Sequence, residues 1–441
     1  MNGLIMAAQL IAGLSILVLL HELGHYLTAR MFGIRVEKFY LFFDAWGFKL
    51  FKFTYKGCEY GIGWLPLGGY VKIAGMIDES MDTEQMKQEP QPWEFRSKPA
   101  WQRLIVMLGG VTVNVILGIF IFWMLVYFNG ESYIPNKEAK NGIVAYELAQ
   151  EIGLKSGDKI LSVNGKPIER YNELWSSEVI FGASVLEVER GSEKLNITVP
   201  KDFIEKLSDK GRSNYIDDLP RMQILIDSVA VGANAEKAGL KKGDQIVAVN
   251  AKPVLYMDEL RSILKDSAGK SILISYIRNS DTLNVNADVS AEGTLGFIPK
   301  IDFKLETKEY SFAQAFSIGA SKAFTTLSDN VKGLGKVVRG EVAATKAVQG
   351  PIGIASIYGA TFDWIKFWTL TAVLSMILAF MNILPIPALD GGHSVFLLIE
   401  MAIGRPLSDK FMEKAQMVGF VILVALMVFA FGNDIWKLFS K

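Results

Sequence analysis

The sequence predicts a polytopic α-helical membrane protein that carries a duplicated α+β domain between two of its spans. Two observations support this fold class. Four apolar segments are long enough to cross a bilayer, and a sixteen-residue pattern occurs twice between the second and the third of them. Half of the 441 residues are hydrophobic, which is high for a soluble protein. The 46 basic residues balance the 46 acidic ones, so the composition gives no indication of a nucleic-acid partner.

The four candidate spans differ in length. Three of them, Leu4 to about Met31, Leu104 to Phe128 and Trp364 to Leu384, could cross a bilayer without help. The fourth, about Ala415 to Phe431, is shorter and reaches a spanning length if Trp436 anchors its end. The first span has no basic residue before it and no small-residue cleavage site after it. We therefore expect an anchored helix there and not a cleavable signal peptide.

The basic residues next to the spans are distributed unevenly. On one side the flanking residues are Arg30, Arg35, Lys38, Arg96, Lys98, Arg103, Arg405, Lys410 and Lys414. The side that holds both termini has fewer, namely Lys137, Lys140, Lys366, Lys437 and Lys441. The positive-inside rule therefore predicts that both termini are outside, together with the long segment from about Gly130 to Asp363.

The external segment contains an internal repeat. Residues 153–168 reappear as residues 239–254, with ten of sixteen positions identical at an offset of 86 residues. This offset suits one small domain per copy, so we expect a tandem pair and not a solenoid. Each copy predicts a turn at Gly-Asp, a short strand, a second turn at Asn-x-Lys-Pro and then a helix.

This order of elements resembles PDZ domains of the permuted bacterial type. The segment Leu295-Gly296-Phe297-Ile298 is similar to the PDZ loop that captures a carboxyl terminus in a backbone nest, which would assign it to the second copy. The counterpart in the first copy, near Tyr215 and Ile216, matches that loop much less well. The resemblance implies C-terminal peptides as possible ligands of the two domains. Whether the grooves bind peptides or only fill space stays open.

An amphipathic helix is predicted after the second copy. Apolar residues recur there at helical spacing, namely Phe312, Phe316, Phe324, Leu327, Val331, Leu334 and Val338. Gly333 and Gly335 weaken its far end. One interpretation is a helix packed on a PDZ domain. We favour a helix that lies on the outer membrane surface beside the membrane helices.

The first span contains the pattern His-Glu-Leu-Gly-His at residues 21–25, directly after the apolar run 4–20. Positions i and i+4 share one helix face, so the two imidazoles can bind one metal ion, and Glu22 can take a proton from a water beside them. The chain has only three histidines. Ionisable groups inside a span cost about 2.5 to 3.5 kcal/mol each on insertion scales. Histidines kept only for helix packing are therefore the less favoured interpretation.

Two histidines are not enough for a hydrolytic zinc site, which takes three protein ligands and one water. A candidate third ligand follows the third span. Pro385 and Pro387 cannot continue a helix, so the span must break at membrane depth, where irregular backbone is tolerated only beside protein or a wet cavity. Asp390 follows this break, although it could instead cap a short helix expected over Ser394 to Ile403. The residues favour Asp390 as the ligand and leave His393 as the alternative.

The motif at residues 21–25, the later pattern Asn-x-x-Pro-x-Pro-x-Leu-Asp-Gly-Gly at 382–392 and the tandem PDZ domains together resemble the site-2 protease family of intramembrane zinc metalloproteases. The similarity is greatest to the bacterial branch that regulates the sigma-E stress response, and it covers nearly the whole chain. The resemblance implies a bacterial cytoplasmic (inner) membrane protein with the PDZ domains and both termini in the periplasm. It also implies roles for five residues: Zn²⁺ ligands His21, His25 and Asp390, catalytic base Glu22, and Asn382 assisting near the substrate.

Residues 61–73 are similar to the family's membrane-associated β-hairpin or sheet, which enters from the cytosolic side. The resemblance implies that Leu67, Gly68, Gly69 and Tyr70 contact the substrate. The residue pattern alone predicts only a weak pair of strands, because the alternation is imperfect and glycine is plentiful.

Asn114, on the second span, matches an asparagine that in the family usually follows Gly-Pro-x-x. Here the preceding residues 110–113 are Gly-Val-Thr-Val, so the proline is missing. This departure leaves the local kink and the role of Asn114 open. It does not affect the expected metal site.

The resemblance implies single-span membrane proteins as substrates, similar to anti-sigma factors, whose external domain another protease has already removed. A helical substrate must unwind first, because each of its carbonyls is already hydrogen-bonded. An exposed strand edge near Leu67 to Val71 could hold the unwound stretch as an added strand. The external domain could then act as a size gate that admits only trimmed substrates.

Two other functions are compatible with parts of the sequence. A membrane-embedded zinc protease acting on soluble or unfolded chains typically takes a glutamate as third ligand; Glu400 is the acidic residue near a suitable place, but the motif from Asn382 to Asp390 would go unexplained. A non-catalytic membrane-anchored PDZ scaffold with a structural metal has no use for Glu22, because closed structural sites need no base. Cys58, as a single thiol, is expected to pack and not to react.

The predicted order of segments has eight parts. Residues 1–31 form the first membrane helix, 32–100 a cytosolic-side β region and 101–129 the second helix. Residues 130–221 and 222–305 form the two PDZ domains, and 306–362 an amphipathic external segment. Residues 363–406 form the third helix with the Asn-to-Asp motif, and 407–441 the fourth helix.

Overall fold

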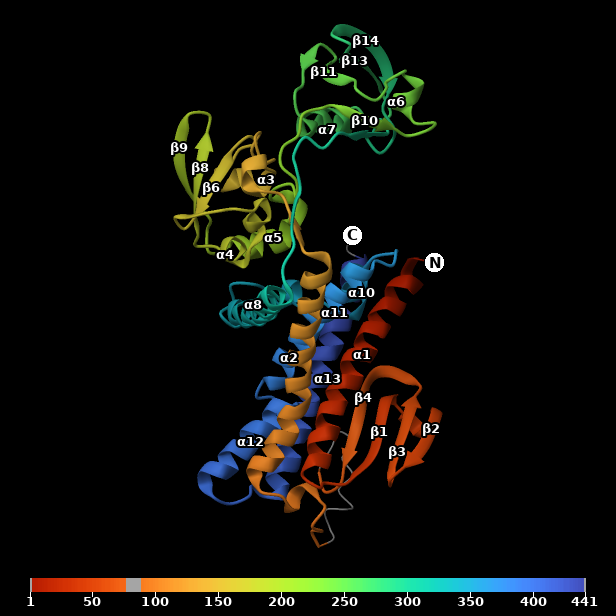
Figure 1. The fold of residues 1–441 in the computed structure, drawn as a ribbon, viewed down its shortest axis with the longest axis vertical. Coiled ribbons are helices and arrows are strands. Elements are labelled where there is room, and N and C mark those ends of the chain that lie inside the picture. Colours follow the sequence, from red (N-terminus) through yellow and green to blue (C-terminus); the bar gives the residue numbers. More distant parts are fainter. Residues whose placement is uncertain (1, 77–88, 440–441) are drawn as a thin grey trace. The chain divides into compact units, whose positions relative to one another are not determined.

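The computed structural model describes residues 2–76 and 89–439, which form two compact units (Figure 1). The first unit comprises Met1–Gly130 together with Glu309–Lys441, and the second comprises Glu131–Lys308. The first unit contains the long apolar helices and is called the membrane unit below. The second contains both copies of the sequence repeat and is called the repeat unit.

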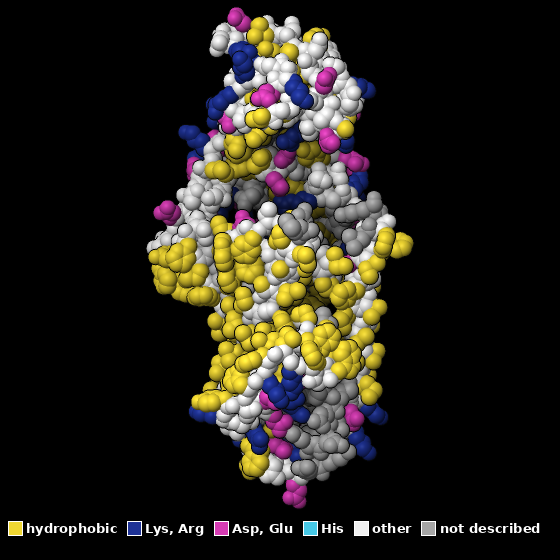
Figure 2. Space-filling model, turned by 90° about the vertical axis from the view of Figure 1, so that its right-hand side faces the viewer, with side chains coloured by type: hydrophobic (Ala, Val, Ile, Leu, Met, Phe, Trp, Pro, Cys, Tyr) yellow, Lys and Arg dark blue, Asp and Glu magenta, His cyan; other side chains and the backbone are white. Residues whose placement is uncertain are grey.

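Four helices of the membrane unit are long and apolar enough to cross a bilayer among the residues that the structure describes. They are α1 (Asn2–Met31), α2 (Ala100–Asn129), α11 (Trp364–Ile383) and α13 (Asp409–Phe439). Each of the four predicted spans is a helix that could cross a bilayer, and the fourth helix begins earlier than its apolar core. Hydrophobic side chains cover much of the face of these helices seen in Figure 2. The first turn of α1 and the last turn of α13 lie at the same end of the membrane unit (Figure 1).

A four-stranded sheet lies beside the lower half of α1 (Figure 1). Its strands are β1 (Val36–Phe43), β2 (Lys49–Tyr55), β3 (Cys58–Gly63) and β4 (Leu65–Ile73), in the order β2-β3-β1-β4. β1 runs parallel to β3 and antiparallel to β4. A short 3₁₀ helix, η1 (Ala45–Gly47), connects β1 to β2. The strand β4 therefore forms one edge of the sheet.

The predicted hairpin over residues 61–73 is wrong in its pairing. β3 and β4 follow one another in sequence, but β1 lies between them. The chain passes tightly around the end of β1, where a Cβ on Gly63 would lie 2.2 Å from the carbonyl oxygen of Phe43. Only glycine fits such a close approach of two backbones. Cys58 is buried in the apolar core beneath this sheet, as expected for a packing residue.

α1 and α2 cross at glycines. A Cβ on Gly24 would lie 2.4 Å from the carbonyl oxygen of Gly109, and a Cβ on Gly109 would lie 2.7 Å from that of Gly24. Small residues at a crossing let two membrane helices approach until their backbones touch. One residue further along α2, a Cβ on Gly110 would lie 2.5 Å from ring atoms of both His21 and His25. The crossing therefore brings the backbone of α2 directly over the two imidazoles.

The predicted amphipathic helix is α8 (Phe312–Val338), which begins at a capping box formed by Ser311 and Gln314. It packs on α2 through its small residues Ala315, Gly319 and Ala323, which are buried. The large residues of the predicted stripe are mostly exposed, and Phe312 and Phe316 contact Trp123. The stripe is therefore not the packing face. The position of α8 on the membrane surface remains a prediction.

Among its described residues, the membrane unit has three shorter helices: α9 (Ala344–Ala347), α10 (Pro351–Tyr358) and α12 (Asp390–Ile403). A further 3₁₀ turn, η3 (Phe95–Ser97), precedes α2. α10 holds the end of α13, because the backbone N–H groups of Gly350, Ile352 and Gly353 donate to the buried carboxylate of Asp434. The N-terminus of a helix stabilises such a carboxylate.

The repeat unit contains two sheets of identical order. In the first copy the strands are β6 (Lys159–Val163), β7 (Lys166–Pro167), β8 (Val185–Arg190) and β9 (Glu193–Thr198), in the order β7-β6-β8-β9. In the second copy they are β11 (Gln245–Val249), β12 (Lys252–Pro253), β13 (Ser271–Arg278) and β14 (Asp281–Asp288), in the order β12-β11-β13-β14. The sequence repeat is thus also a structural repeat.

Both copies bury the aspartate of the predicted Gly-Asp turn. Asp158 pairs with Arg190, and Asp244 pairs with Arg278 in the same geometry. Each arginine also donates to the carbonyl of the glycine that opens its repeat pattern, Gly153 or Gly239. A buried carboxylate needs such a partner, which explains why the Gly-Asp turn recurs in both copies.

The helices differ between the copies. The expected helix after Asn-x-Lys-Pro is α7 (Met257–Asp266) in the second copy, but only a 3₁₀ helix, η5 (Tyr171–Trp175), followed by α4 (Ser177–Ile180), in the first. The remaining helices are α3 (Glu147–Glu151), α5 (Phe203–Lys210) and α6 (Asn234–Lys237), with 3₁₀ turns η4 (Asn136–Glu138) and η6 (Arg212–Asn214).

Two small strand pairs complete the repeat unit. β10 (Ile226–Val229) pairs with β15 (Phe297–Pro299), so the segment 295–298 belongs to the second copy, as the sequence predicts. The first copy has only an isolated bridge between Ala145 and Ile216 at the corresponding place. β5 (Glu131–Tyr133) pairs with β16 (Glu306–Lys308), which holds the two ends of the unit together.

We predict that Gly109→Ala destabilises the membrane unit by roughly 1–3 kcal/mol, because the added methyl group forces the backbones of α1 and α2 apart. The measurement is thermal unfolding of the purified protein in detergent, followed by circular dichroism.

The matched control is Gly432→Ala on the membrane helix α13, where the new Cβ meets nothing within 4 Å. This variant is expected to unfold at or above the temperature of the unmodified protein, because alanine is the better helix former. Equal transitions for the two variants would contradict the proposed role of the crossing.

Candidate metal centre

The two histidines of the motif lie on one face of α1. His21 and His25 are four residues apart on an uninterrupted helix, so their rings project to the same side, one turn apart. The centroids of the two rings are 4.9 Å apart and the Nε2 atoms are 3.2 Å apart. The α-helix itself therefore provides the first two side chains of the site.

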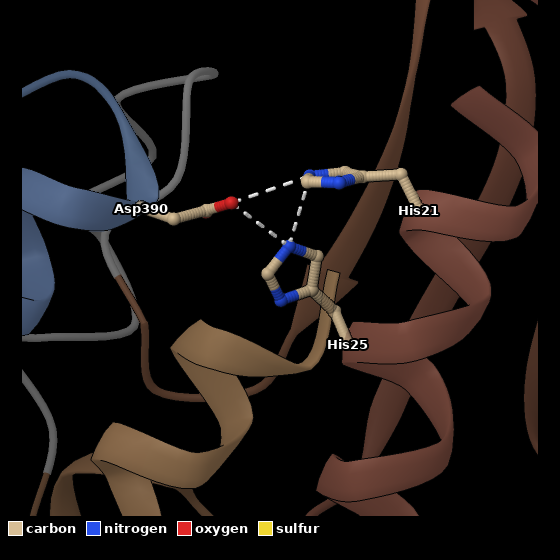
Figure 3. A group of neighbouring side chains, drawn as sticks. All are labelled: His21, His25 and Asp390. Atoms are coloured by element: carbon tan, nitrogen blue, oxygen red, sulfur yellow. Dashed lines mark hydrogen bonds and ion pairs between the residues drawn. The ribbon is translucent and has the colours of Figure 1, made fainter. Parts of the chain in front are cut away.

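The third side chain comes from the broken end of the third span. α11 ends at Ile383, and the loop with Pro385 and Pro387 leads into α12, as the sequence predicts. The short helix begins at Asp390 and not at Ser394. The Asp390 side chain does not cap the helix; it points toward the imidazoles of α1 (Figure 3).

The two glycines after Asp390 explain this early start. A Cβ on Gly391 would lie 2.3 Å from the carbonyl oxygen of Ile383, and a Cβ on Gly392 would lie 2.3 Å from that of Ile386. The first turn of α12 therefore packs directly on the loop backbone. This contact fixes the direction in which Asp390 leaves the helix.

His21, His25 and Asp390 form a triangle of ligand atoms (Figure 3). Oδ2 of Asp390 lies 3.2 Å from Nε2 of His21 and 3.4 Å from Nε2 of His25, and the two nitrogens are 3.2 Å apart. Atoms bound about 2.0–2.2 Å from one tetrahedral centre lie roughly 3.3–3.6 Å apart. The three edges of the triangle fit a divalent cation.

The hydrogen bonds of the carboxylate also fit a cation. Oδ2 of Asp390 is buried and accepts no hydrogen bond within the described part of the chain. A buried anionic oxygen without a donor is costly unless a cation neutralises it. A metal ion between the three residues would satisfy this oxygen.

Three groups outside the ligand triangle contact ring nitrogens of the two imidazoles. Nδ1 of His25 lies 2.8 Å from the carbonyl oxygen of Val106, and Nδ1 of His21 lies 3.1 Å from the side-chain amide of Asn114. The amide of Asn382 lies 3.3 Å from Nε2 of His21. Metal-bound histidines usually hold their second ring nitrogen in such a contact.

A cavity of about 460 Å³ opens onto the triangle. It is lined by nearly all of the residues that the sequence proposes for the site, namely His21, Glu22, His25, Gly68, Gly69, Tyr70, Asn114, Asn382 and Asp390. The backbone of Leu67 lies in β4, but its side chain is outside the described part of the structure. Three segments that are far apart in sequence thus share one cavity with the histidines.

The edge strand β4 lies close to the proposed base. A Cβ on Gly69 would lie 2.8 Å from Val18 and 3.6 Å from Cγ of Glu22. The strand is therefore as near to α1 as its backbone allows. A chain that paired with this edge would lie beside the histidines.

The sheet also contributes charged and phenolic groups to the cavity wall. Tyr70 donates a hydrogen bond to Asp44, and burial together with this bond raises the pKa of Tyr70. On the same sheet, hydrogen bonds from Lys49 and Tyr40 lower the pKa of Glu59 to about 2. Tyr70 is therefore neutral and Glu59 is ionised throughout the physiological pH range.

The two alternative ligands lie elsewhere. His393 lines the cavity but does not join the ligand triangle. Glu400 forms an ion pair with Arg103 and lines a separate cavity of about 290 Å³. The structure therefore places Asp390, and not His393 or Glu400, beside the two imidazoles.

Some groups of the site were not identified from the sequence. The carbonyl of Val106 has no signal in the sequence, because any residue provides a backbone carbonyl. Lys38 and Lys72, which line the cavity, face each other across β1 and β4 and become visible only with the strand register. Gly110 could be noticed in the sequence, because it is the first residue of the segment that matches the family pattern before Asn114. Its contact with the histidines is seen only in the helix crossing.

Comparison with known proteins agrees with this geometry. The profile of peptidase family M50 matches residues 9–426. The regulator of sigma-E protease RseP of Salmonella typhimurium is 30% identical, with 98% of each chain covered, and RseP of Escherichia coli K12 is 29% identical with the same coverage. A Neisseria meningitidis protein that is provisionally named a zinc metalloprotease is 28% identical, covering 96% of this chain and 97% of its own. The chain therefore belongs to peptidase family M50, the site-2 protease family.

Proposed function

We propose that this protein is an intramembrane zinc metalloprotease that hydrolyses peptide bonds within the transmembrane segments of single-span membrane proteins. The single observation that carries the proposal is the triangle of His21, His25 and Asp390 beside a cavity that also contains Glu22. Two neutral imidazoles and one carboxylate are a common donor set for catalytic zinc, which leaves one position for water.

The residues of the cavity have separate roles in the proposed reaction. His21, His25 and Asp390 would hold a zinc ion, which would supply Lewis-acid polarisation of the scissile carbonyl and make a water more acidic. Glu22 accepts the proton from the attacking water and delivers it to the leaving amine. Asn382 and Asn114 hold positions around His21, and the apolar helices exclude bulk water from the reaction.

The edge strand β4 is proposed to bind the substrate. A transmembrane helix offers no free carbonyl, so the stretch to be cut must unwind before it reaches Glu22. An unwound chain in an apolar environment needs new partners for its N–H and C=O groups. The edge of β4 with which no described strand pairs provides them beside the histidines, through main-chain pairing along Gly68, Gly69 and Tyr70.

The repeat unit is proposed to consist of two PDZ domains on the periplasmic side of a bacterial inner membrane. Support comes from the shared sheet order of the two copies, from the pairing of the segment 295–298 with β10, and from the basic residues that flank the other side of the spans. We propose that this unit acts as a size gate, so that the site receives substrates whose external domain has been removed, as in anti-sigma factors.

We predict that Glu22→Gln retains zinc and loses cleavage, by at least about 10²–10⁴-fold, because the amide keeps the shape of the side chain but cannot accept the proton. Zinc is measured by elemental analysis of the purified protein, and cleavage with a single-span substrate in detergent.

Two control variants separate the possible roles. Asp390→Ala is expected to lose zinc as well as activity, whereas Glu400→Gln, outside the cavity, is expected to keep both. Cleavage at the normal rate by Glu22→Gln would remove this residue from the mechanism.

We predict that the unwinding step makes cleavage sensitive to helix stability in the substrate. Replacing a glycine near the cut by leucine stabilises the helix by about 1 kcal/mol, which is expected to slow cleavage about fivefold per replacement. The same replacement at the far end of the substrate segment is the control and is expected to have little effect. Equal rates for both positions would argue against unwinding.

We predict that deleting residues 142–289 lets the enzyme cleave a substrate whose external domain is intact. The pairing of β5 with β16 brings the two ends of the repeat unit together, so a short glycine-serine linker can replace the deleted part. Cleavage of a trimmed substrate at an unchanged rate shows that the membrane unit is intact. If the untrimmed substrate stays uncut, the repeat unit is not the gate.

A further inference from the structure

The side chain of Asn114 contacts one of the two histidines. It lies on α2, four residues after Gly110, and is completely buried. Its amide is 3.1 Å from Nδ1 of His21, on the opposite side of the ring from the ligand triangle. Its backbone carbonyl accepts a hydrogen bond from Ser375 on α11. The residue is therefore held between two helices directly behind His21.

A neutral imidazole binds a cation through one nitrogen and must carry its proton on the other. His25 meets this requirement through Val106, because a carbonyl oxygen can only accept and so fixes the proton on Nδ1. Nε2 of His25 is then free for a metal. His21 needs an equivalent acceptor at its own Nδ1.

The amide of Asn114 provides this acceptor only in one orientation. With Nδ2 toward the ring, the amide donates to Nδ1 of His21 and places the ring proton on Nε2, where the ligand triangle is. In that orientation Oδ1 of Asn114 is buried and has no hydrogen-bond partner among the described residues. The oxygen and nitrogen of an amide have the same shape, and turning the amide over places Oδ1 beside Nδ1 of His21, where it can accept the proton that a metal-binding His21 carries there.

We propose that Asn114 is a positioning residue that fixes the metal-binding form of His21 by accepting a hydrogen bond from its Nδ1 through Oδ1. This inference rests on the proposed zinc site. It assigns Asn114 to the metal and not to the substrate. It also gives both histidines the same arrangement, with a hydrogen-bond acceptor from α2 behind each ring.

Both hydrogen-bond acceptors behind the histidines come from α2. Val106 and Asn114 are two turns apart on one helix, and Gly110 lies midway between them, against both rings. α2 therefore acts as a template that aligns two acceptors with the two histidines of α1. The missing proline before Asn114 does not disturb this template, since α2 is continuous from Ala100 to Asn129.

The test compares Asn114→Leu, Asn114→Ala and Asn114→Asp in the full-length protein purified in detergent. Zn²⁺ affinity is measured by competition with a chelator of known affinity. Leucine and alanine cannot accept a hydrogen bond, and loss of such a partner typically weakens metal binding 10–100-fold. Aspartate accepts but cannot donate, so Asn114→Asp is expected to bind Zn²⁺ within a few-fold of the unmodified protein.

Thr112→Val is the matched control. Thr112 lies on α2 as well, but its side chain is exposed and donates to the carbonyl of Leu108, so the Zn²⁺ affinity is expected to stay unchanged. The alanine variant keeps the test decisive if the leucine variant does not fold.

Each outcome has one meaning. Weak binding by leucine and alanine with normal binding by aspartate supports the inference. Equal affinity of all variants overturns it, and so does an aspartate variant as weak as alanine, because the amide would then act as a donor. If the unmodified protein itself binds no Zn²⁺, the proposed zinc site fails, and this inference fails with it.

Discussion

The close crossing of α1 and α2 is the constraint on which the candidate site depends. Gly24 and Gly109 allow the two backbones to touch, and this contact brings Gly110 against both imidazoles. Because the helices touch, groups of α2 contact the Nδ1 atom of each ring: the backbone carbonyl of Val106 contacts His25, and the side-chain amide of Asn114 contacts His21. A larger residue at the crossing would move these groups away from the rings. The geometry of the histidines is therefore set by residues that have no side chain.

The site also depends on a break in a membrane helix. A continuous third span would keep the side chain of residue 390 on a regular helical path, away from α1. Pro385 and Pro387 end the helix, and Gly391 and Gly392 let the chain fold back on itself so that Asp390 faces the histidines. The irregular backbone of this loop packs against α13, where a Cβ on Gly419 would be 2.5 Å from the amide nitrogen of Ala388. Irregular backbone at this depth is tolerated because protein covers it.

The sheet and the small face of α8 show where residue patterns alone were insufficient. Alternation along residues 61–73 predicts strands but not their partners, and the insertion of β1 between β3 and β4 depends on a chain reversal at Gly63. The apolar stripe of α8 predicts a helix, yet the helix packs through Ala315, Gly319 and Ala323. In a membrane protein a large apolar residue has no preference for the protein interior over lipid, so packing follows small residues instead. Periodicity therefore predicts the helix but does not identify the small residues through which it packs.

The sequence by itself determined the four spans, the duplicated domain, the histidine pair on one helix face and the break that precedes Asp390. These features depend on local properties: the length of apolar runs, the helical repeat and the inability of proline to continue a helix. Only the tertiary structure decided between Asp390, His393 and Glu400, identified β4 as an edge strand of the described sheet next to Glu22, and placed Asn114 behind His21. Each of these results depends on the distance between atoms far apart in the chain, and that distance is fixed by helix crossings and strand order, which no local pattern encodes.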